Sequence, residues 1–126
     1  MIKNVSKLIN RHMKKWTYCL GLRWWEINVY YIKKKQAKKI FKENKTSAIA
    51  ARTYADWRYA TANIYFNIPF LKTLNPETIE AIVVHELCHV LVNEMQKKGK
   101  HHEERVVTGL TKAFLWTDEK IEEEQE

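Results

Sequence analysis

The sequence predicts an α+β fold: a small three-stranded antiparallel or mixed sheet, packed on an N-terminal helix, a buried central helix and a C-terminal helix. Apolar residues recur at helical spacing towards both ends of the chain, and three segments rich in β-formers lie between them. The chain has 126 residues, 45% of them apolar, with only three Gly and two Pro. We therefore expect one domain over residues 1–126, with a real core and little linker.

The first expected element is an amphipathic helix over residues 4–20, which Gly21 ends. Its apolar residues lie three or four positions apart: Val5, Leu8, Ile9, Met13, Trp16 and Leu20. The segment 24–32, with sequence WWEINVYYI, is aromatic and β-branched and predicts a strand.

Two more strands are expected at residues 46–56 and 61–68, joined by a turn at 57–60. In the second strand, apolar and polar side chains alternate, which is typical of a strand with one buried face. The apolar set is Ala62, Ile64, Phe66 and Ile68, and the polar set is Asn63, Tyr65 and Asn67.

Asn75, Pro76 and Glu77 form a strong helix start, with an N-cap, a proline in the first turn and an acid near the positive helix end. Residues 78–92 are almost wholly apolar, so we expect this helix to be buried on several sides and to end no later than Gly99. A last helix is predicted at 102–116, with an apolar stripe of Val106, Val107, Leu110, Ala113 and Phe114.

Charge is unevenly distributed. Residues 1–45 carry a net charge of +11, much of it in a predicted basic loop at 33–45, and the acidic tail 118–126 carries −5. A lysine run usually keeps a loop solvated, but it also allows weak nucleic-acid binding through residues 1–45. The sequence shows neither a signal peptide nor an apolar run of the roughly 18 residues that span a bilayer. With two cysteines only, we expect a cytoplasmic protein without a membrane partner.

The strongest motif is His85-Glu86-Leu87-Cys88-His89 within the buried helix. Histidines at i and i+4 lie on one helix face and can hold one metal ion, while Glu86 projects beside the open metal position. Zinc suits this set because it takes His and carboxylate ligands and acidifies a bound water. We therefore predict Zn²⁺ as cofactor, His85 and His89 as ligands, and Glu86 as general base.

The motif, on a buried helix after TANIYFNIPF, resembles the zincin superfamily of metallopeptidases. It is similar to the minimal zincins, namely SprT-like proteins and small phage-encoded metallopeptidases, over residues 46–116. The resemblance implies a minimal zincin fold, a protein or peptide substrate, and an edge strand at Asn63–Asn67 that binds substrate. The resemblance does not extend to residues 1–45.

The third ligand remains open among Glu104, Glu103 and a histidine, His102 or His101. Glu104 lies beside the apolar stripe, and Thr108 follows four residues later, similar to the third ligand of thermolysin-like zincins. Glu103 lies within the stripe, where burial is costly for a free carboxylate but acceptable for a ligand. SprT-like proteins use a histidine near His102, but with different neighbours. For Glu104 to reach His89, the central helix must stop soon after Val92, or the two helices must cross steeply.

Three functions follow from these residues. The first is a zinc endopeptidase; the second is a nucleic-acid-associated protease or DNA-binding zinc protein; the third is a domain with structural zinc. Glu86 argues against the third, because a structural site needs no general base. Tyr54, Tyr59, Tyr65 and His101 remain candidates for stabilising an oxyanion.

Overall fold

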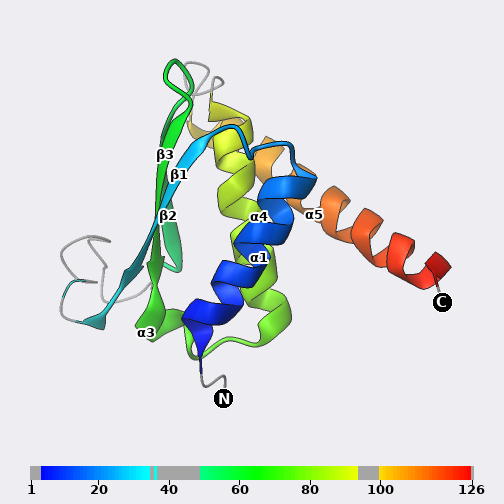
Figure 1. The fold of residues 1–126 in the computed structure, drawn as a ribbon, viewed down its shortest axis with the longest axis horizontal. Coiled ribbons are helices and arrows are strands. Elements are labelled where there is room, and N and C mark those ends of the chain that lie inside the picture. The colour runs from blue at the N-terminus through cyan, green and yellow to red at the C-terminus, as the bar shows by residue number, and fades with distance from the viewer. Residues whose placement is uncertain (1–3, 35, 37–48, 94–99, 126) are drawn as a thin grey trace.

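A computed structural model describes residues 4–34, 36, 49–93 and 100–125, leaving out the side chains of residues 100–102 and 125 (Figure 1). The elements follow in the order α1 (Val5–Cys19), β1 (Glu26–Ile32), β2 (Ala51–Asp56), β3 (Thr61–Asn67), α3 (Ile68–Leu71), α4 (Pro76–Leu91) and α5 (Lys100–Gln125). The predicted α+β class is confirmed, and so is the turn at 57–60. In the part of the chain described, no helix is both long and apolar enough to cross a membrane.

The sheet is mixed, with strand order β1-β3-β2. β1 runs parallel to β3, with Val29 opposite Ile64, and β2 runs antiparallel to β3, with Thr53 opposite Ile64. The predicted edge strand at Asn63–Asn67 is therefore wrong, because β3 is hydrogen-bonded on both sides. Its buried apolar face suits the centre of the sheet. β1 and β2 form the two edges, and β2 is the edge strand that packs beside α4.

The helices cover one face of the sheet (Figure 1). Ala62, Ile64 and Phe66 of β3 face them and are almost fully buried. α1 contributes Val5, Ile9, Met13 and Trp16 to the same core, and α4 contributes Ile79, Val83, Val84, Leu87, Cys88 and Val90. Burial of this apolar surface is the main stabilising contribution to the fold, and it fixes α4 between the sheet and the other helices.

The ends of the helices follow the expected local chemistry. Asn75 caps α4 through its Oδ1, which accepts from the backbone N–H of Thr78, and Pro76 occupies the first turn. Gly21 has a φ of +70° just after α1, a conformation that glycine adopts without steric cost. α4 ends at Leu91, with Val92 as its C-cap. The expectation that this helix stops early is therefore confirmed.

Three parts of the sequence prediction need correction. α5 extends to Gln125, so residues 118–125 of the predicted acidic tail are helical. This segment is rich in Glu and lacks Gly and Pro, which favours a helix. The short helix α3 was missed, and β2 begins at Ala51 and not at residue 46. Most of the basic loop predicted at 33–45 lies outside the described residues.

Candidate metal centre

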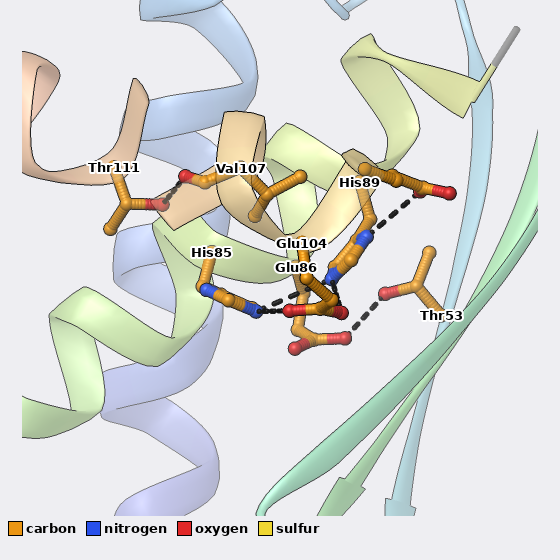
Figure 2. Close-up of polar contacts among 8 residues, drawn as sticks. Thr53, His85, Glu86, His89, Glu104, Val107 and Thr111 are labelled. Atoms are coloured by element: carbon orange, nitrogen blue, oxygen red, sulfur yellow. Dashed lines mark hydrogen bonds and ion pairs between the residues drawn. The ribbon is translucent and has the colours of Figure 1, made fainter. Parts of the chain in front are cut away.

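His85, Glu86 and His89 all project from α4 near the start of α5 and the edge strand β2 (Figure 2). One helical turn separates the two histidines, and their ring centroids lie 4.9 Å apart with the rings nearly perpendicular. The early end of α4 leaves room for the chain to return, so that α5 brings its first turns over the same histidines.

Three side chains converge on one point. The Nε2 atoms of His85 and His89 are 3.3 Å apart. Glu104 Oε2 lies 3.4 Å from His85 Nε2, and Glu104 Oε1 lies 2.9 Å from His89 Nε2. A tetrahedral zinc with bonds of about 2.0–2.1 Å would separate its ligand atoms by roughly 3.3 Å. Within the described residues, His85, His89 and Glu104 are the group that could hold a metal ion.

Glu103 determines which nitrogen of His89 points into this group. Its Oε1 lies 2.9 Å from His89 Nδ1, and the Glu103 side chain is only 9% exposed. A carboxylate at that distance favours a proton on Nδ1, which leaves the Nε2 lone pair directed towards His85 and Glu104. The predicted burial of Glu103 is confirmed, but its carboxylate meets the opposite edge of the imidazole from the converging ligand atoms.

Glu86 is buried, with 7% of its surface exposed. The hydroxyl of Thr53 on β2 donates a hydrogen bond of 2.7 Å to Glu86 Oε1. Burial raises the pKa of the Glu86 carboxyl, while the Thr53 hydrogen bond and the nearby His89 and His85 act against that rise. The carboxylate is thus held in a fixed position beside the histidines, where it can exchange a proton with a neighbouring group.

A pocket of about 640 Å³ gives access to the site. One wall is formed by β2 and the residue two positions before it: Ile49, Ala51, Arg52, Thr53 and Tyr54. The other wall is formed by α4 and α5: His85, Glu86, His89, Glu103 and Glu104. A larger hollow of about 780 Å³ between α1 and β1 is lined by neither histidine nor carboxylate. The pocket beside β2 is therefore the candidate site.

The structure separates the candidates that the sequence left open. It brings Glu104 together with His85 and His89, and it places Glu103 behind His89. The side chains of His101 and His102 lie outside the described residues. Of the three tyrosines, Tyr54 lines the pocket, whereas Tyr65 stacks on Tyr30 and Tyr59 is 74% exposed on the hairpin.

Sequence reasoning missed Thr53. Nothing in the local sequence marks it, because its contact with Glu86 spans 33 residues and depends on how the strand packs on the helix. Its alternation with Arg52 and Tyr54 would have placed it on the helix-facing side of a strand, but only the sheet order puts that strand next to Glu86.

Comparison with known protein families gives a match over most of the chain. A model of the SprT-like family matches residues 13–111, so the family reaches well into the N-terminal region that the sequence resemblance left unassigned. No curated protein and no solved structure matches the chain, and the expected link to phage proteins stays a prediction. The match covers most of the chain and includes the whole histidine and carboxylate cluster. The chain therefore belongs to the SprT-like family, which is associated with zinc and with metallopeptidase activity.

Proposed function

We propose that this protein is a zinc-dependent endopeptidase that hydrolyses peptide bonds with Glu86 as general base. The observation that carries the proposal is the convergence of His85, His89 and Glu104 beside the buried Glu86 carboxylate. A structural zinc site normally closes its coordination with four protein ligands, whereas a catalytic site has three and an open position. Three converging ligand atoms and an adjacent pocket fit the catalytic type.

The donor set favours zinc among common metals. Two imidazole nitrogens and one carboxylate oxygen suit Zn²⁺, whereas Mg²⁺ and Ca²⁺ prefer oxygen ligands alone. When bound, zinc would supply an acidified water and a Lewis acid for the peptide carbonyl. Glu103 supports this assignment by fixing the ring of His89, in the way that outer-sphere carboxylates orient metal-binding histidines.

Glu86 would carry the proton. Its Oε1 accepts from Thr53, so Oε2 would be the atom that takes a proton from water and later delivers it to the leaving amine. Burial disfavours the charged form and raises the pKa of the Glu86 carboxyl above its ordinary value, which makes the carboxylate a stronger base.

The edge of β2 is suited to hold the substrate as an added strand. Ala50 O accepts from Asn67 N, and hydrogen-bonded pairs alternate along an antiparallel ladder. Residues 52 and 54 therefore turn their backbone groups towards β3, while Ala51, Thr53 and Ala55 turn theirs to the free edge. An extended peptide can pair with those groups and pass beside Glu86.

A second, mainly apolar pocket of about 390 Å³ adjoins the first and shares Ala51, His85 and Glu86 with it. The small side chains of Ala50, Ala51 and Ala81 leave this space open, and Ile82 forms part of its wall. We therefore expect the substrate to place an apolar side chain close to the scissile bond, since burying it there would contribute binding energy.

Replacing Glu86 with Gln tests the mechanism. Glu86→Gln keeps the side-chain shape and an oxygen for the Thr53 hydroxyl, but it removes the base. We expect bound zinc to remain and peptide hydrolysis to fall by about 10² to 10⁴. The measurement combines metal analysis with cleavage of a quenched peptide library rich in apolar residues.

Glu77→Gln is the matched control, because Glu77 lies in the first turn of the same helix and is exposed. It should leave cleavage unchanged. Hydrolysis by Glu86→Gln at the wild-type rate, with zinc present in both proteins, would refute the proposed role of Glu86.

A further inference from the structure

We propose that Thr53 is a positioning residue that holds the general base and ties it to the strand that receives the substrate. This inference rests on the proposed function and extends it to a residue on a different element. Thr53 lies in the edge strand β2, 33 positions before Glu86, and the two side chains meet across the cleft (Figure 2).

The contact fixes one oxygen of the base. Thr53 Oγ1 donates to Glu86 Oε1 at 2.7 Å, a length typical of a strong hydroxyl-to-carboxylate bond. A glutamate side chain has three rotatable bonds, so a carboxylate without such an anchor would sample several orientations. The bond to Oε1 selects one of them and presents Oε2 to the position where the proton is exchanged.

The backbone of the same residue faces the substrate. By the alternation of the β2–β3 ladder, the N–H and C=O of Thr53 lie on the free edge, while its side chain lies on the helix side with Glu86. A peptide paired with that edge would therefore be aligned by the residue that aligns the base. The backbone of Thr53 would bind the substrate strand and its side chain binds Glu86, so this one residue sets the distance between them.

A threonine meets both requirements. Its β-branched side chain is favourable in a strand and has one strongly restricted torsion, which keeps the hydroxyl aimed at the helix. Serine can make the same hydrogen bond with a less restricted side chain. Valine has the same shape as threonine and cannot make the bond. Comparing the serine and valine variants therefore separates the role of the hydroxyl from that of packing.

The experiment compares Thr53→Val, Thr53→Ser and the matched control Thr61→Val, which makes the same change on β3 away from the pocket. For each zinc-loaded protein, the melting temperature, the zinc content, kcat and KM on a cleaved peptide, and the Kd of acetohydroxamate are measured. Acetohydroxamate is a useful probe because it chelates zinc and directs its hydroxyl proton at a neighbouring carboxylate, which gives a readout independent of turnover.

We expect Thr53→Val to lose about 10- to 100-fold in kcat, the range typical of outer-sphere partners, with little change in KM. Acetohydroxamate should bind that variant about tenfold more weakly. Thr53→Ser should recover most of both losses, while zinc content and melting temperature stay close to wild type. Thr61→Val should match wild type throughout.

Equal kcat and equal hydroxamate affinity in wild type and Thr53→Val would overturn the inference and leave the proposed peptidase function intact. A serine variant as impaired as the valine variant would also overturn it, because a hydroxyl at this position would then not be enough to hold Glu86 in place. If wild type cleaves no peptide but hydroxamate binding still separates valine from serine, the peptidase function fails and the positioning role stands.

Discussion

Two clusters on α4 each place a histidine against a glutamate, and they have opposite characters. One turn and a half before His85, Glu80 accepts from Trp16 Nε1 at 2.9 Å, and its Oε2 lies 3.4 Å from His12 Nδ1 and 3.5 Å from Lys15 Nζ. Lys15 also pairs with Asp118 of α5 at 2.8 Å. This cluster joins α1, α4 and α5 through contacts between donors and acceptors.

At the metal centre the balance is different. His85 and His89 present Nε2 to each other at 3.3 Å, and the Glu104 carboxylate lies against both. Two imidazole nitrogens and a carboxylate, all of them able to bind a metal, converge there, whereas at Glu80 an indole N–H, an ammonium group and an imidazole surround one carboxylate. A shared cation resolves the first arrangement, and the second needs none. A histidine beside a glutamate therefore does not by itself indicate a metal site, because the other groups around the carboxylate decide whether a cation is needed.

The largest expected effect separates the two clusters by metal content. His85→Ala and Glu104→Ala should each weaken zinc binding by more than the 10- to 100-fold typical of an outer-sphere partner, because two ligands remain. Glu80→Ala should keep full zinc. Metal analysis and competition with a chelator measure these affinities.

Stability gives a second reading of the same variants. Zinc that binds the folded state stabilises it, so a chelator should lower the melting temperature of wild type and of Glu80→Ala, but hardly that of His85→Ala. Full zinc affinity in Glu104→Ala would show that another residue is the third ligand. His101 and His102 would then be the next positions to mutate.

Glu103 should show an intermediate effect. Glu103→Ala removes the partner of His89 Nδ1, and we expect zinc affinity to fall by about 10- to 100-fold, less than for Glu104→Ala. Glu103→Gln should lose less, because its amide oxygen can still accept from Nδ1–H. If Glu103→Ala instead loses as much zinc as Glu104→Ala, Glu103 is itself a ligand and the separation of the two acids is wrong.

The Glu80 cluster should affect stability and not metal. Glu80→Ala leaves the Trp16 indole and Lys15 without their shared acceptor, at a cost of about 1–3 kcal/mol in the free energy of unfolding. For a chain of this length, each kcal/mol corresponds to roughly 4 °C in melting temperature. Glu119→Ala, at an exposed position on α5, is the control and should change it little. A neutral result for Glu80→Ala would show that the cluster contributes nothing net.

The smallest effect concerns pH. Burial lowers the pKa of His12 more than the adjacent Glu80 raises it. The unfolded chain therefore binds a proton more readily than the folded one, so stability is fully present above the ordinary pKa of about 6.5 and falls as pH drops below it. Melting curves between about pH 7 and pH 5 should show a steeper loss for wild type than for His12→Gln. Parallel curves for the two proteins would contradict this assignment.

The sequence by itself determined the local elements and the core of the site. Helical spacing, the Asn75 cap and the alternation in 61–68 were enough to predict α1, α4 and β3, because these signals act over a few residues. The spacing of His85 and His89 also fixed their shared helix face, since four residues make about one helical turn.

Only the tertiary structure decided the order of the strands, the choice between Glu103 and Glu104, and the contact of Thr53 with Glu86. The two acids are neighbours in sequence and differ by about 100° around α5, so the rotation and crossing of that helix determine which one meets the histidines. The edge strand likewise depends on which strands pair with β3. Those pairings join segments that lie far apart in the chain. Periodicity shows which residues share a face of a helix or strand. Which element packs against that face depends on contacts between segments far apart in the chain.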